Sequence, residues 1–260
     1  MVEATALPEI AGLVRQNDPD RFLCALFAPA EARDAVFALI AFNHELARAR
    51  EAVREPMMAL IRLQWWREVV EEAAAGAPAR RHEVATPLSA AIRAGRLDAA
   101  ALEAMIEARE ADEGGADAVP LAQRLRGTAG GLAAEMGRVL GAPESAMEGL
   151  RQVGTAYGLG GTLRSAGVLA AQGRDPLPQG PGAVEAARRL AGEGLRLLEE
   201  GRRHLATLPR QAVAAALPGV LAGRDLRRVL APGWSPGTVP GPRGLGDRLA
   251  VTWAGWRGRV

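Results

Sequence analysis

Apolar side chains recur at helical spacing along nearly the whole chain, and this periodicity constrains the fold more than any other feature. In one stretch, the residues near a common face are Val36, Leu39, Ile40, Asn43, Leu46 and Val53. Residues three or four apart share one face of an α-helix, so the spacing predicts a helix from about Ala30 to Arg54. Alternating runs of Val, Ile and Thr, which are typical of strands, are absent from the sequence. We therefore expect an all-α protein.

Further segments carry the same signal. Residues 57–76 place Ile61, Trp65 and Val69 four apart and end in a glycine, which suits a helix C-terminus. Trp65 and Trp66 are adjacent, so at most one of them can face the core squarely. The remaining expected helices span Pro87–Ala94, Ala99–Ala111, Pro120–Leu140, Ala146–Gln172, Ala183–Thr207 and Arg210–Leu221.

The distribution of Gly and Pro suggests one domain over residues 1–260. We expect a helical core over about 18–222, a linker rich in Pro and Gly over 231–247, and a short terminal segment over 248–260. Neither of the two segments rich in Gly and Pro separates stretches that could form independent cores.

Composition narrows the class of protein. The sequence contains no lysine, and its arginines are interleaved with acids to a net charge of +2, so a nucleic-acid partner is not expected. Cys24 is the single cysteine and lies in an apolar stretch, which favours a buried thiol and a reducing compartment. No apolar run approaches a membrane span, and the first residues do not resemble a secretory signal. We expect a cytoplasmic protein.

Local motifs give no catalytic constellation. Gly154, Gly158 and Gly161 recur at helical spacing, which favours close helix packing over contact with a ligand. The three histidines stand apart, without a second ligand at metal spacing.

Four blocks in order resemble the squalene/phytoene synthase family. They are FLCALFAPAEARDAVFALIAFNHELA, LIRLQWWREVVEEA, LRGTAGGLAAEMGRVLG and VGTAYGLGGTLRSAGVLAAQGRDPLP, and the likeness is good from Asp18 to Pro178. The resemblance implies an isoprenoid-synthase-like helical bundle around a central cavity. Active members of this family join two prenyl diphosphates, and two Asp-rich stretches on facing helices hold Mg²⁺ against the diphosphates.

Both Asp-rich stretches are missing here. Under the resemblance, the first falls on His44, Ala47, Arg48 and Glu51, of which Glu51 is the one retained acid. The second falls on Gly158, Gly161, Ser165, Val168 and Leu169, with Arg164 kept among them. We therefore expect no catalytic residue, no bound metal and no cofactor.

The blocks resemble in particular a branch of the family that lacks these motifs and acts in the assembly of respiratory complex I. That resemblance implies a non-catalytic assembly factor whose partners are complex I subunits or assembly intermediates, at the inner membrane or near it. The composition, rich in arginine and free of lysine, indicates a bacterial homologue. The candidate residues for a pocket or partner surface are Asn43, Glu45, Arg48, Gln64, Trp65, Arg67, Tyr157, Gly158, Gly161 and Arg164.

Two other functions stay open at this point. One is a Mg²⁺-dependent prenyltransferase with displaced ligands, in which Glu51, Tyr157 and Arg164 would line the site. The other is a protein that holds a prenyl lipid or a quinone without reaction. Near the C-terminus, Trp253 and Trp256 stand among Arg248, Arg257 and Arg259, which suits either a membrane interface or docking onto the bundle.

Overall fold

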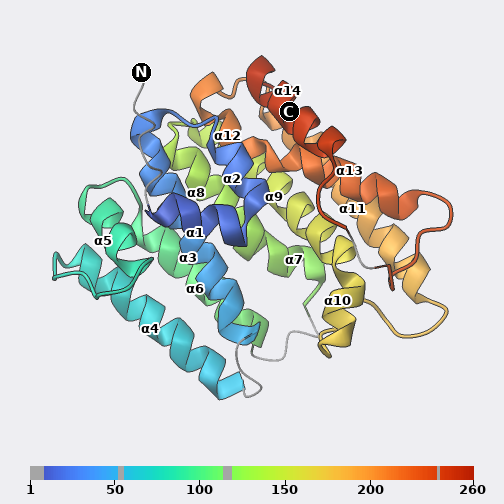
Figure 1. Ribbon diagram of the computed structural model, residues 1–260, viewed down its shortest axis with the longest axis horizontal. Coiled ribbons are helices and arrows are strands. Elements are labelled where there is room, and N and C mark those ends of the chain that lie inside the picture. The colour runs from blue at the N-terminus through green and yellow to red at the C-terminus, as the bar shows by residue number, and fades with distance from the viewer. Residues whose placement is uncertain (1–8, 52–55, 114–118, 239–240) are drawn as a thin grey trace.

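The computed structural model describes residues 9–51, 56–113, 119–238 and 241–260, and all regular structure in these ranges is helical (Figure 1). The expected all-α bundle is therefore confirmed. In chain order the elements are α1 (Glu9–Asn17), α2 (Pro19–Ala25), η1 (Ala30–Ala32), α3 (Arg33–Glu51), α4 (Pro56–Ala74), α5 (Ala85–Arg93), α6 (Ala99–Glu113), α7 (Leu121–Leu125), η3 (Arg126–Gly130), α8 (Gly131–Val139), α9 (Glu144–Arg164), α10 (Ala166–Ala171), α11 (Ala183–His204), η4 (Arg210–Ala212), α12 (Val213–Ala216), α13 (Pro218–Leu230) and α14 (Leu245–Arg257).

Helix α3 carries much of the core of the N-terminal half. Phe37, Leu39, Ile40 and Phe42 are almost fully buried, and the helix packs against α1, α4, α5 and α8. Trp66 of α4 is 3% exposed and meets Phe42 edge to face, with ring centroids 5.4 Å apart. Its neighbour Trp65 is only half-buried, so the expectation that at most one of the two faces the core squarely is confirmed.

Helix α9 is the central element of the C-terminal half. It packs against α11 and α13 on one side, and against η3 and α8 on another. Gly154 makes the second contact possible, because a Cβ there would meet the Cβ of Ala133 at 2.7 Å and Cα of Gly130 at 2.9 Å. Close helix packing, which the spacing of the three glycines predicted, also explains Gly158, because a Cβ there would meet Leu125 at 3.0 Å. The same prediction is wrong for Gly161, which has nothing within 4 Å of that position.

The structure also corrects several expected helix bounds. The long helix expected over Pro120–Leu140 is interrupted by a π-helical turn, η3. The turn lies against α9, and the hydroxyl of Thr128 within it donates to the carbonyl of Arg124 at 3.3 Å. The helix expected over Ala146–Gln172 begins earlier, at Glu144, and breaks at Ser165, which caps α9 outside helical geometry.

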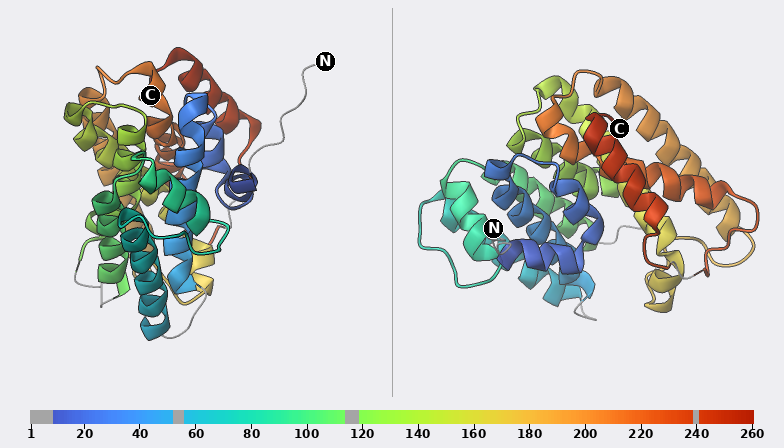
Figure 2. Two further views of the ribbon diagram at one scale, coloured as in Figure 1. Left: turned by 90° about the vertical axis from the view of Figure 1, so that its left-hand side faces the viewer. Right: turned by 45° about the horizontal axis from the view of Figure 1, so that its top comes forward.

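The structure also contains helices outside the bounds expected from the sequence. Helices α1 and α2 were not expected; the Asp18 carboxylate caps α2 by accepting from the amide of Arg21, and Pro19 supplies a first helical residue. Helix α13 continues to Leu230 instead of ending at Leu221, and it packs against α9 and α11. Helix α14 begins at Leu245, inside the expected linker, and packs on α2 and α13 (Figure 2).

Within the described ranges, none of the helices is long and apolar enough to cross a membrane.

Candidate functional site

A cavity of about 350 Å³ lies between α2, α3, η3 and α9. The two long helices contribute Asn43, His44 and Ala47 from α3, and Tyr157, Gly158 and Gly161 from α9. Asn43 is 7% exposed, and its side-chain oxygen has no hydrogen-bond partner among the described residues. The other lining residues are Asp18, Asp20, Arg21, Arg109, Leu125, Thr128, Ala129, Thr162, Arg164, Ser165 and Arg243. We call this the central cavity.

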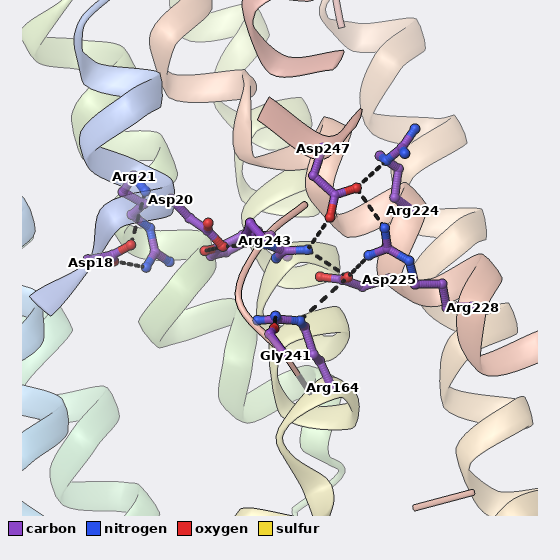
Figure 3. A network of polar contacts seen from close by, with 11 residues as sticks. Asp18, Asp20, Arg21, Arg164, Arg224, Asp225, Arg228, Gly241, Arg243 and Asp247 are labelled. Atoms are coloured by element: carbon purple, nitrogen blue, oxygen red, sulfur yellow. Dashed lines mark hydrogen bonds and ion pairs between the residues drawn. The ribbon is translucent and has the colours of Figure 1, made fainter. Parts of the chain in front are cut away.

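Charged residues that were not expected line the central cavity on the side of α2 and form a polar wall there. Figure 3 shows the contacts among them. The carboxylate of Asp18 pairs with Arg21 at 2.7 Å, and the guanidinium of Arg21 lies 4.5 Å from the ring centroid of Tyr157. The Tyr157 hydroxyl donates to Asp20 at 3.4 Å. These contacts hold the Tyr157 side chain against Arg21 and Asp20 in the lining of the cavity.

Arg243, from the segment before α14, joins this wall to the C-terminal helices. Its Nε donates to Asp20 at 2.9 Å, and its Nη1 donates to Asp225 of α13 at 2.7 Å and lies 3.8 Å from Asp247 of α14. Arg243 is 9% exposed, and both carboxylates of the C-terminal helices are nearly buried. Figure 3 shows its side chain reaching across the space between α2 and these helices.

The remaining ion pairs of the network involve the two buried acids, Asp225 and Asp247. Arg228 donates to Asp225 at 2.8 Å and to Asp247 at 2.7 Å, and Arg224 donates to Asp247 at 2.5 Å. Arg164 of α9 lies 4.0 Å from Asp225 and donates to the carbonyl of Gly241. Helices α2, α9, α13 and α14 are therefore tied together through one set of ion pairs.

A groove of about 860 Å³ lies on the other side of Arg243. Asp18, Asp20, Arg164 and Arg243 line both the groove and the central cavity, so this polar wall separates them. The apolar residues in the lining of the groove include Phe22, Leu23, Leu26 and Leu221.

The structure divides the ten residues predicted for a pocket or partner surface. Asn43, Tyr157, Gly158, Gly161 and Arg164 line the central cavity. The others lie on or near α4: Glu45, Arg48 and Trp65 line a separate pocket of about 240 Å³, Gln64 is exposed, and Arg67 bridges α4 to α6 by donating to Glu110 at 2.8 Å.

Comparison with known proteins decides the family. The family model for squalene/phytoene synthase matches residues 14–181, which is more than half of the chain. The chain belongs to the squalene/phytoene synthase family. Solved structures agree in fold: a dehydrosqualene synthase in complex with a ligand has a TM-score of 0.78 at 14% identity, covering 95% of this chain and 94% of that one. Squalene synthase HpnC from Alicyclobacillus acidocaldarius has a TM-score of 0.71 at 17% identity, covering 85% and 91%.

The curated relatives with higher local identity are named as assembly factors of complex I and not as synthases. NADH dehydrogenase (ubiquinone) complex I, assembly factor 6 of Homo sapiens is 47% identical over 60 residues, which are 23% of this chain and 18% of the relative. The protein of the same name from Bos taurus is 38% identical over 98 residues, which are 38% of this chain and 29% of the relative. The matched stretches therefore span less than a third of these relatives.

The squalene/phytoene synthase family implies Mg²⁺, and the residues at the two motif positions do not fit that ion. The positions that reach the central cavity hold His44, Ala47, Gly158, Gly161 and Ser165, whereas Mg²⁺ takes carboxylate and phosphate oxygens. Two more positions, Val168 and Leu169, lie on α10, and the side chain of Glu51 lies outside the described part of the chain. In the described ranges, no three His, Cys, Asp or Glu side chains are close enough to hold a metal ion.

Burial and charge shift several pKa values in and near the site. Burial raises the pKa of Tyr157 well above its ordinary value, and the nearby Asp18 adds to this effect. Burial also raises the pKa of Cys24, so the thiol stays protonated and unreactive at neutral pH. For Asp247, burial alone would raise the pKa, but hydrogen bonds from Arg228 and Arg224 outweigh it and leave the pKa below its ordinary value.

The lowered pKa of Asp247 predicts a loss of stability in acid. In the pH range between its folded and ordinary pKa values, the unfolded chain binds more protons than the folded one, so stability there rises with pH. The stabilisation is present above the ordinary value of 3.8 and is lost as pH falls below it. We expect the free energy of unfolding to fall less steeply below about pH 5 in Asp247→Asn than in the wild type. Denaturant midpoints measured across this range test the difference.

The matched control is Asp34→Asn, which alters an exposed aspartate in the first turn of α3. This variant removes an exposed carboxylate without touching the ion pairs of Asp247. Parallel acid profiles for the wild type and Asp247→Asn would show that the ion pairs of Asp247 do not stabilise the folded state.

Proposed function

We propose that this protein is a non-catalytic member of the squalene/phytoene synthase family that acts in the assembly of respiratory complex I. The proposal rests on the contrast between this chain's sequence identity to the complex I assembly factors and its sequence identity to the synthases. Relatives named as complex I assembly factor 6 are 36–47% identical to this chain over 60–98 residues in the mammalian proteins. The synthases share its fold at 14–17% identity.

The lining of the central cavity supports the non-catalytic part of the proposal. Ionising an allylic diphosphate requires positive charge on the leaving group, which clustered Mg²⁺ supplies in active enzymes. Here the motif positions that reach the cavity carry no carboxylate. The cavity acids Asp18 and Asp20 are already engaged by Arg21 and Arg243. They hold the wall together and offer few free oxygens to a cation.

The outer face of α4 is the partner surface that we propose. Met57, Met58, Leu60 and Ile61 are 36–65% exposed, and Gln64 is exposed on the following turn. The pocket formed by Glu45, Arg48 and Trp65 lies beside this face, and the guanidinium of Arg80 covers Trp65 at 5.5 Å. Apolar side chains around an aromatic pocket are typical of the centre of a protein interface. The partner would be a complex I subunit or assembly intermediate, at the cytoplasmic side of the inner membrane in a bacterial host.

Deletion of the gene from its host, followed by rescue, tests the proposed function. We expect the deletion strain to lose most of its membrane NADH:ubiquinone oxidoreductase activity and to accumulate smaller assembly intermediates on native gels. The wild-type gene should restore both. Ile61→Asp, which puts a charge into the proposed partner surface, should fail to restore them, whereas the matched control Arg188→Asp on α11 should succeed. Unchanged complex I in the deletion strain would contradict the proposal.

The groove favours a second function, the binding of a prenyl lipid or a quinone. The lining of the groove combines the apolar Phe22, Leu23, Leu26 and Leu221 with arginines that include Arg15 and Arg248, and this combination suits a lipid chain with a polar head. Extraction of the purified protein followed by mass spectrometry tests this idea. A prenyl lipid that is retained by the wild type and lost in Leu23→Asp would support it, and extracts without lipid would count against it.

A further inference from the structure

Helix α14 has two unlike faces, and one of them packs on the bundle. Asp247, Val251 and Gly255, spaced by four, are buried on this face. Gly255 lies so close to Phe27 that an added Cβ would approach the ring at 2.6 Å. The helix meets α2 and α13 in this way (Figure 2). Docking onto the bundle was one of the two roles expected for the terminal segment. The structure shows this docking, but it uses only one side of the helix.

The opposite face exposes large apolar side chains. Leu245, Leu249, Trp253 and Trp256 are 74%, 59%, 58% and 64% exposed. At 3.6 residues per turn, these four positions fall on one side of the helix, away from the buried face. We call them the α14 stripe. The two indole rings lie side by side, with centroids 5.4 Å apart.

The charged side chains of α14 that border the α14 stripe are positive. By helical spacing, Arg248 borders the stripe on one side and Arg257 on the other, and Arg259 follows the helix; all three are exposed. The one acid of α14, Asp247, faces inward to Arg224 and Arg228. The exposed side of the helix therefore combines tryptophan, leucine and arginine without a carboxylate.

We propose that the α14 stripe lies on the surface of a bilayer that contains anionic lipids. Indole rings and leucines would enter the boundary between headgroups and acyl chains, while Arg248 and Arg257 would extend to the lipid phosphates. A second copy of this chain fits the stripe less well, because a symmetric contact would bring the same arginines against each other. The proposal rests on α14 alone, so it can fail or hold independently of the role in complex I assembly.

Sedimentation of the full-length protein with lipid vesicles tests the proposal. We expect binding to mixed phosphatidylcholine–phosphatidylglycerol vesicles, little binding to phosphatidylcholine alone, and weaker binding in high salt. Trp253→Ala/Trp256→Ala and Arg248→Glu/Arg257→Glu should each weaken binding to the mixed vesicles by about tenfold or more. Because all four side chains are exposed, both double variants should keep the wild-type helical circular dichroism.

The matched control is Met57→Ser/Ile61→Ser, which removes exposed apolar side chains from α4 instead. This control should bind vesicles like the wild type. Three results would overturn the proposal: a wild type that does not sediment with the mixed vesicles, a tryptophan variant that binds as well as the wild type, or equal loss in the α4 control. A wild-type dimer that the tryptophan variant converts to a monomer, without vesicle binding, would identify a second copy as the occupant.

Discussion

Replacing Arg243 by alanine is expected to lower the free energy of unfolding by about 3 kcal/mol, because it removes the arginine that pairs with both Asp20 and the buried carboxylate of Asp225. Arg243 bridges Asp20 and Asp225 at 2.9 and 2.7 Å, and the latter acid is 3% exposed. Removing one member of a buried ion pair typically costs about 3–5 kcal/mol. We place the effect at the lower end because Asp225 keeps its contact with Arg228 at 2.8 Å.

Thermal and denaturant unfolding of the variant measure this loss. A change of about 3 kcal/mol in a chain of this size corresponds to a melting temperature lower by roughly 6–12 °C. Arg248→Ala is the matched control, since it removes an exposed arginine only five residues away. We expect that control to stay within about 0.5 kcal/mol of the wild type. Equal stability of the Arg243 variant and the wild type would show that the network does not hold α2 to the C-terminal helices.

Replacing Gly154 by alanine is expected to cost about 2–3 kcal/mol. The added methyl group would meet the Cβ of Ala133 at 2.7 Å and the Cα of Gly130 at 2.9 Å, and it would also meet the carbonyl oxygen of Ala129. Backbone atoms of η3 cannot rotate away as a side chain can, so α9 and η3 must separate. Overpacking of a close-packed interior costs about 1–3 kcal/mol, and we expect the upper part of that range.

Gly161→Ala on the same helix is the control for this prediction. Nothing lies within 4 Å of a Cβ at Gly161, so the methyl group would enter the central cavity. Alanine is favoured over glycine in a helix by about 1 kcal/mol, and this variant should therefore be slightly more stable than the wild type. Denaturant midpoints of both variants decide the matter. If the two substitutions shift the midpoint in the same direction, the close approach of α9 and η3 is not what requires Gly154.

The sequence predicts the helices well where a single face is apolar over several turns. The spacing of Val36, Leu39 and Ile40 places α3 within three residues of its observed ends. The predicted helix bounds are wrong where a tertiary contact overrides the local pattern. One example is the π-helical turn η3, which lies against α9. Helix α13 was expected to end at Leu221 but continues to Leu230, along a surface that packs against α9 and α11.

The candidate site, like the helix bounds, could be predicted only in part from the sequence. The family resemblance marked Asn43, Tyr157 and Arg164 as candidates for a pocket or a partner surface, and the structure places all three in the lining of the central cavity. Their functional role stays a prediction. The polar wall could not be predicted, because Asp20 and Arg243 are 223 positions apart and neither belongs to a local motif. Its one sequence signal is Asp18 before a proline, which marks a helix cap. A cap does not reveal what the same carboxylate does across the cavity.

The central claim is that this chain keeps the family's fold without its prenyl-transfer activity. The most direct test measures the release of pyrophosphate from farnesyl and geranylgeranyl diphosphate, with Mg²⁺ varied and products extracted. We expect no release above background from the folded protein at any Mg²⁺ concentration, while an active synthase measured alongside releases it readily. Mg²⁺-dependent turnover by the wild type that is lost in Glu51→Gln would contradict the claim and indicate a displaced metal site.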